Sequence, residues 1–138
     1  IRGLADGSSP TGPSALDALR AAAAAARDAV VAGDLQALGA AMRANTEAQR
    51  QLHPALVGTE AQRGIEAARR AGALGWKVNG AGGEGGSLAV LCGAGAGERA
   101  ALEAAVARAS SDCRLIRTTV ARRGFAIVRQ DEAAGADG

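Results

Sequence analysis

The chain has 138 residues, enough for one compact domain with its own core. Its 16 basic and 14 acidic residues give a net charge of +2, a balance that argues against a nucleic-acid-binding or polybasic membrane-binding protein. Trp76 and Phe125 are the only aromatic residues, too few for stacking single-stranded nucleic acid. The sequence has no run of about 18 apolar residues, so we expect a cytoplasmic protein with no membrane partner.

Both ends of the chain are expected to lie outside the folded domain. The first residue is Ile1 rather than Met, so we expect a piece of a longer protein. Residues 1–13 contain DGSSPTGP, whose Gly, Ser and Pro indicate a linker or flexible segment, and residues 131–138 are expected to be a flexible tail. One domain over residues 14–130 is predicted.

The first predicted helix opens at SALD, where Ser14 and Asp17 have the spacing of a capping box. Apolar residues then recur at spacings of three and four, as on one helix face: Leu16, Leu19, Ala23, Ala26 and Val30. The run of alanines in this segment favours helix and allows close packing against a neighbour.

A second helix is predicted from the N-cap residue Asp34 to about Leu52, and a third opens at a second capping box, TEAQ, residues 59–62. The inward stripe of the second helix carries two amides one turn apart, Asn45 and Gln49. Either these amides are satisfied by backbone groups or by the third helix, or they line a cleft.

The second half of the chain predicts four strands and one helix. The strands are expected over 74–79, 87–92, 113–120 and 125–130, with the helix over 98–110. Short connections make each consecutive strand pair a hairpin. The prediction is therefore an α+β fold with a mainly antiparallel four-stranded sheet and helices packed on one face.

The most unusual stretch is GAGGEGG, residues 80–86, between the first two strands. A hairpin needs one or two glycines, and each extra one costs up to about 1 kcal/mol relative to Ala. Such a loop can bring backbone N–H groups close to an anion or take positive φ at several positions. Lys77 and Asn79 could add a charge and an amide, whereas the carboxylate of Glu84 must point away or bind a metal or a donor-rich ligand. A flexible turn without a ligand is the alternative.

Other kinds of site find little support. The loop is not followed by GK[ST], as in a Walker loop, and it precedes a strand rather than the helix of a dinucleotide fingerprint. The single histidine, His53, has no evident nucleophile partner and is expected to be structural or exposed. We assign neither a catalytic residue nor a metal ligand.

The stretch GALGWKVNGAGGEGGSLAVL, residues 72–91, resembles the third motif of the GHMP kinases, in which a helix end and a glycine-rich loop precede an apolar strand. AGDLQALGAAMRANTEAQRQL, residues 32–52, is similar to the helix before that motif. The resemblance implies the ferredoxin-like C-terminal domain of these kinases. Two positions depart from the usual motif: Glu84 stands where Gly is usual and Asn79 where Thr or Ser is common.

The resemblance also implies a function. GHMP kinases transfer the γ-phosphoryl group of ATP, with Mg²⁺, to a small metabolite, and their N-terminal domain carries the main ATP loop. That ATP loop is not found in this chain, so ATP and Mg²⁺ would be bound mainly outside it. The implied phosphate and substrate loop consists of Gly80, Ala81, Gly82, Gly83, Glu84, Gly85 and Gly86. Asn45 and Gln49 would face the acceptor side, near Lys77 and Asn79.

Three interpretations therefore stand. The first is the substrate-side domain of an ATP-dependent small-molecule kinase, with a sugar as the first acceptor class, inactive without its N-terminal partner domain. The second is a free-standing anion-binding, ligand-binding or regulatory module without catalysis. The third is a structural domain that forms a homo-oligomer through its alanine-rich first helix.

Overall fold

The computed structural model describes residues 12–80, 85–109, 113–118 and 124. The elements in these ranges are α2 (Gly12–Ala32), α3 (Leu35–Leu52), the 3₁₀ turn η1 (Pro54–Leu56), α4 (Thr59–Arg70), β1 (Gly75–Asn79), β2 (Ser87–Leu91) and α5 (Ala96–Ala109). This order confirms the α+β class. No helix in the described ranges combines the length and the apolar character needed to cross a membrane.

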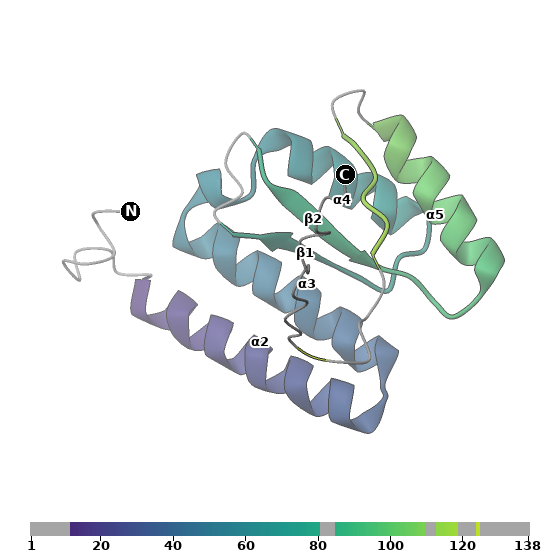
Figure 1. The fold of residues 1–138 in the computed structure, drawn as a ribbon. Coiled ribbons are helices and arrows are strands. Elements are labelled where there is room, and N and C mark those ends of the chain that lie inside the picture. The colour runs from purple at the N-terminus through teal and green to yellow at the C-terminus, as the bar shows by residue number, and fades with distance from the viewer. Residues whose placement is uncertain (1–11, 81–84, 110–112, 119–123, 125–138) are drawn as a thin grey trace, which may run out of the picture.

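The described sheet is an antiparallel hairpin of β1 and β2, with Gly75 opposite Leu91 at one end and Asn79 opposite Ser87 at the other. It lies between α3 and α4 (Figure 1). Contacts with α3 are made by β1, whereas α4 contacts both strands. The predicted first hairpin is thus confirmed, and the described part of the chain contains two strands of the four expected.

The strand expected over 113–120 is not formed by residues 113–118, which are exposed and in irregular structure. Leu115 and Ile116 are 47% and 65% exposed, so the apolar side chains of this run gain little from burial. Because strand preference depends on packing against neighbours, an apolar run without that packing does not become a strand. Instead, Arg117 pairs with Glu103 of α5 at 3.2 Å. The other expected strand, 125–130, lies outside the described residues.

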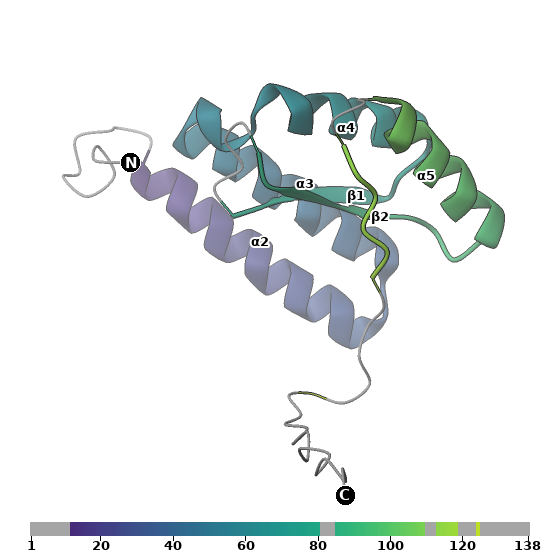
Figure 2. The same ribbon diagram turned by 45° about the horizontal axis from the view of Figure 1, so that its top comes forward.

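Helix α2 packs along α3 (Figure 2). Its buried side chains are Ala15, Ala22 and Ala29, each two helical turns from the next. The apolar face expected from the sequence is therefore partly wrong, since Leu16 and Val30 are 41% and 64% exposed. Alanine, with only a Cβ, lets two helices approach closely. The packing gained in this way outweighs the burial of the larger side chains.

Both predicted capping boxes are wrong. Helix α2 already begins at Gly12, so Ser14 lies inside it and Asp17 pairs with Arg20 at 2.8 Å. Helix α4 begins at Thr59 with Gly58 as its N-cap, which has no side chain to donate or accept. The N-cap of α3 is as predicted, because Asp34 accepts from the N–H of Ala37 at 2.9 Å.

The core next to the hairpin is small and aliphatic. Val57, Ile65 and Val78 are buried together, and Trp76 and Leu88 pack against them. These residues join α4 and the turn before it to the inner face of the hairpin. This packing fixes the strand ends from which the glycine-rich loop departs.

Candidate functional site

Both ends of the glycine-rich loop have positive φ. Gly80 has φ +65° and Gly86 has φ +104°, values that L-residues with a side chain seldom adopt. Just outside these two glycines, the side chains of the last residue pair of the hairpin also bond to each other, because Asn79 Nδ2 donates to Ser87 Oγ at 3.0 Å. The base of the loop is therefore well defined. Ala81, Gly82, Gly83 and Glu84 lie outside the described residues.

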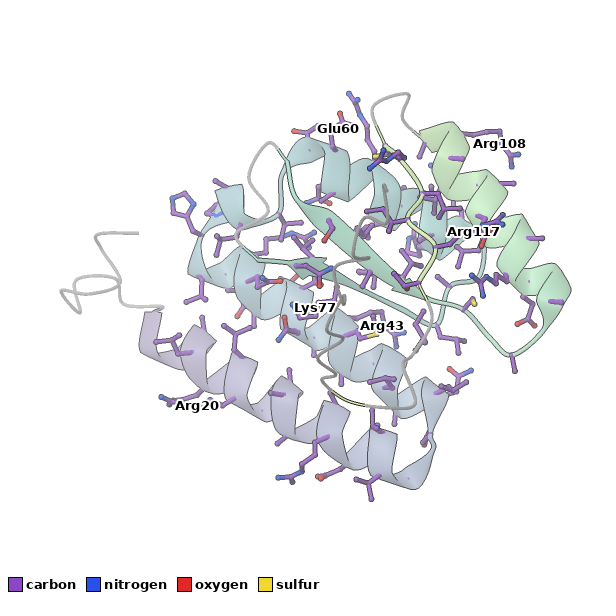
Figure 3. The ribbon with its side chains drawn as sticks, viewed as in Figure 1. Arg20, Arg43, Glu60, Lys77, Arg108 and Arg117 are labelled. Atoms are coloured by element: carbon purple, nitrogen blue, oxygen red, sulfur yellow. The ribbon has the colours of Figure 1, made fainter. Side chains whose placement is uncertain are left out.

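Side chains of helix α3 form hydrogen bonds with the backbone along β1. Three of them, spaced three residues apart, donate to backbone carbonyls: Arg43 to Leu74, Thr46 to Trp76 at 3.2 Å, and Gln49 to Gly80 at 3.2 Å. The free edge of a strand otherwise presents unpaired backbone N–H and C=O groups, and covering it prevents pairing with another chain. Figure 3 shows Arg43 on the part of α3 beside the hairpin.

Sequence reasoning missed Arg43 and Thr46. Arg43 also lies over the Trp76 ring, with its guanidinium carbon 5.8 Å from the ring centre, within the range of a cation–π contact. Thr46 is only 1% exposed. The signal that could have found them is the three-residue repeat of Arg43, Thr46 and Gln49 on one helix face.

Gln49 is the α3 side chain that reaches the loop. It is 9% exposed, and its Nε2 is occupied by the Gly80 carbonyl, while its buried Oε1 accepts from no described residue. Asn45, one turn earlier, is half-buried. Of the two alternatives for these amides, a backbone partner is therefore found for Gln49.

Lys77 and Asn79 are two residues apart on β1, so their side chains lie on the same face of the hairpin. Lys77 is half-buried, and its ammonium group donates to the carbonyl of Val78 at 2.9 Å. Four predicted site residues in the described part of the chain thus come together around the loop base: Gln49, Asn79, Gly80 and Gly86. Lys77 lies two residues before Asn79 on β1, further from the loop.

The close approach of α3 to β1 depends on two glycines. A Cβ built on Gly39 would lie 2.3 Å from the carbonyl oxygen of Leu74, and one built on Gly75 would lie 2.5 Å from the Gly39 Cα. Helix α3 can therefore touch the strand backbone at this point. From there the helix rises about 15 Å to Gln49, which brings that amide to the loop base.

Carboxyl groups with shifted pKa values lie away from the loop. A hydrogen bond from Arg69 lowers the pKa of Glu66 on α4, and a hydrogen bond from Arg99 lowers that of Glu103 on α5. Both belong to ion pairs on helix surfaces. These shifts are explained by local pairing, so they identify no acid or base.

Gln49→Glu is expected to destabilise the chain by about 3 kcal/mol at pH 7.5, because a buried carboxylate would face the Gly80 carbonyl without a donor. Burial raises the pKa of this new carboxyl group. When the pH falls below that pKa, the protonated group can donate to the carbonyl, so the deficit relative to wild type should shrink.

Urea unfolding at pH 7.5 and pH 5 measures this difference. Gln51→Glu is the matched control, because Gln51 is exposed on the same helix, and it should change stability little at either pH. A Gln49→Glu deficit that is the same at both pH values would contradict the described environment of Gln49.

Comparison with known families agrees with this arrangement. The family model described as GHMP kinases C terminal matches residues 16–111, from α2 through α5, including the hairpin and its glycine-rich loop. A search of curated proteins found no match to the chain. Because the family match covers well over half of the sequence, the chain belongs to the GHMP kinase C-terminal domain family.

Proposed function

We propose that this chain is the substrate-side domain of a cytoplasmic ATP-dependent small-molecule kinase. In this proposal an N-terminal domain binds most of the ATP, and the γ-phosphoryl group passes to a metabolite, with sugars as the first acceptor class to test. The observation that carries the proposal is the base of the glycine-rich loop. Gly80 and Gly86 take positive φ there, and Gln49 binds the Gly80 carbonyl, in a domain of the GHMP kinase family.

Phosphoryl transfer depends mainly on positioning the reactants and stabilising charge. A loop without side chains can bring backbone N–H groups within hydrogen-bonding distance of phosphate oxygens. In the proposed site, Gly82 and Gly83 supply that backbone. Gln49 keeps the loop base in place, and Asn45, one turn earlier on α3, faces the acceptor.

The groups present fit ATP phosphates better than they fit Mg²⁺. Around the loop base, the backbone amides, the Asn79 amide and the Lys77 ammonium are hydrogen-bond donors, which suit phosphate oxygens. Mg²⁺ prefers carboxylate and phosphate oxygens. The described residues contain no cluster of three metal-ligating side chains. We therefore assign the phosphates partly to the loop, and Mg²⁺, which neutralises charge on the phosphates, to the N-terminal domain.

A panel of metabolites with ATP tests the proposal. The full-length protein is expected to phosphorylate one acceptor class, whereas the purified 138-residue chain should not turn over any of them. Turnover by the chain alone at ordinary kinase rates, about 1–100 s⁻¹, would refute the division into two half-sites. No turnover by either protein, with phosphate still bound, would instead support a non-catalytic ligand-binding module.

A further inference from the structure

An open groove of about 860 Å³ lies between α4 and α5, away from the glycine-rich loop. The two helices contact each other and lie side by side at one margin of the fold (Figure 1). Of the described residues that line the groove, half are alanines, among them Ala67 on α4 and Ala105 on α5. These small side chains leave room between the helices for a further segment of polypeptide.

Arginines stand at both ends of this α4–α5 groove. Helix α4 ends, and α5 begins, near the end of the hairpin where Gly75 is opposite Leu91, so the two helices run antiparallel. Of the arginines that line the groove, Arg70 therefore lies at one end, and Arg63 and Arg108 lie at the other. Along α4, Arg63 and Arg70 are about 10 Å apart.

Carboxylates offset only part of this positive charge. Glu60 pairs with Arg63 at 2.7 Å. Glu66 pairs with Arg69 at 2.9 Å and lies 3.7 Å from Arg70. With the arginine of α5, four guanidinium groups thus stand against two carboxylates in and beside the groove. The charge complement of this groove is a segment with acidic ends and small residues between them.

The C-terminal residues 131–138, DEAAGADG, have this pattern. Asp131 and Glu132 precede a run of alanine and glycine, and Asp137 follows it. The five positions from Glu132 to Asp137 span about 8 Å as helix and about 17 Å when extended, values that bracket the separation of the arginines on α4.

We propose that residues 131–138, the acidic segment, dock in the α4–α5 groove. Its two leading carboxylates lie beside Arg63 and Arg108, and Asp137 lies beside Arg70. The alanines of the segment then face the alanines of the two helices. This docking is independent of any kinase activity.

The path of the chain allows this contact. Arg117 pairs with Glu103 of α5 at 3.2 Å, so the chain passes beside one of the two helices before it reaches the acidic segment. The 13 positions from Thr118 to Asp131 can span about 45 Å, whereas a domain of this size has a radius of gyration of about 14 Å. The acidic segment can therefore reach the groove of its own chain.

The strength of the docking follows from its being tethered and charged. Exposed ion pairs are individually weak, but a short tether gives the segment an effective concentration on the order of millimolar at the groove. Salt screens such pairs, since the Debye length falls to about 3 Å at 1 M. We therefore expect a reversible contact that forms at low salt and is lost at high salt.

Nitrogen-15 relaxation of the full 138-residue chain tests the docking at the amide of Ala134. Its order parameter should exceed about 0.6, the limit below which backbone is flexible, at about 0.05 M NaCl and fall below it at about 1 M. Arg63→Ala with Arg108→Ala should give the high-salt value already at low salt. Arg20→Ala with Arg27→Ala is the matched control, because it removes the same charge from exposed positions on α2, and it should behave like wild type. An order parameter that neither salt nor the groove variant changes would overturn the proposal.

A charge swap tests the pairing itself. Arg63→Glu with Arg108→Glu should free the acidic segment, and adding Asp131→Lys with Glu132→Lys should restore the order of Ala134. Circular dichroism of each variant confirms that it is folded. A swapped chain in which Ala134 stays as mobile as in the Arg63→Glu, Arg108→Glu chain would overturn the assigned contacts.

Discussion

Gly39→Ala is expected to lower the free energy of unfolding by about 2–3 kcal/mol, although alanine is the better helix former. The new Cβ would lie 2.3 Å from the Leu74 carbonyl oxygen, 2.6 Å from its carbon and 3.2 Å from the Gly75 nitrogen. All three atoms belong to the backbone of the strand, so no side chain can rotate aside. Relief requires α3 to move away from β1.

That movement has a further cost along the helix. Thr46 and Gln49 donate to the carbonyls of Trp76 and Gly80 only while α3 stays close to the strand. Lengthening either of these part-buried hydrogen bonds should cost about 1 kcal/mol each. The loss at Gly39 should therefore reach beyond its own contact and reduce the order of the loop base.

Urea unfolding followed by circular dichroism measures the effect, with Gly97→Ala as the control. Gly97 also lies in a helix, α5, but a Cβ there meets nothing within 4 Å. This control should leave stability unchanged or raise it by up to about 1 kcal/mol. Equal stabilities of the Gly39→Ala and Gly97→Ala variants would show that α3 and β1 are not in backbone contact.

The contact between Gly39 and Gly75 also shows which features of the fold the sequence alone could not predict. Periodicity predicts that α3 exists and that Asp34 caps it, because these depend on neighbours along the chain. Nothing local distinguishes Gly39 from a tolerated helix glycine. Its importance comes from a strand 36 positions later in the sequence, and a pattern of apolar spacing does not carry such a pairing.

The error on α2 has a related cause. The spacing placed Leu16 and Val30 on the predicted inward face, whereas the buried positions lie one residue earlier, at alanines 15, 22 and 29. The buried residues are alanines because the energetic gain comes from the close approach of two helix backbones, which apolar area does not measure. The leucine and valine are left exposed on the neighbouring face of the helix.

The candidate site also has a part that the sequence predicted and a part that it did not. The number of glycines in residues 80–86 predicted a loop of special backbone conformation, and the positive φ of Gly80 and Gly86 agrees with it. For the amide of Gln49 the sequence left open a backbone partner or a place in a cleft, and in the structure it donates to the Gly80 carbonyl. Helical periodicity gave the face of α3 correctly for Gln49, but the position of the strand beside it was needed to identify its partner.

In the full-length protein, if it is the proposed kinase, replacing both Gly82 and Gly83 by Val is expected to lower kcat/KM by at least about 10²-fold while the protein stays folded. Loss of one pre-organised backbone donor to a developing charge commonly has an effect of this size. Valine restricts the backbone, and in the proposed site its branched side chain would hinder the close approach of a phosphoryl group to the loop backbone. Both changes act on the loop between Gly80 and Gly86, leaving the held base of the loop intact.

Steady-state kinetics with the acceptor found in the metabolite panel provides the measurement, and Gly97→Val provides the control. Gly97 lies in α5 with open space around it, so the same substitution there should leave kcat/KM within about two-fold of wild type. Unchanged kinetics in the Gly82→Val, Gly83→Val protein would remove the loop from the mechanism. A loss of activity with a normal unfolding midpoint would instead assign the glycines to phosphoryl transfer, because Gln49 and the Asn79–Ser87 pair already hold the loop base.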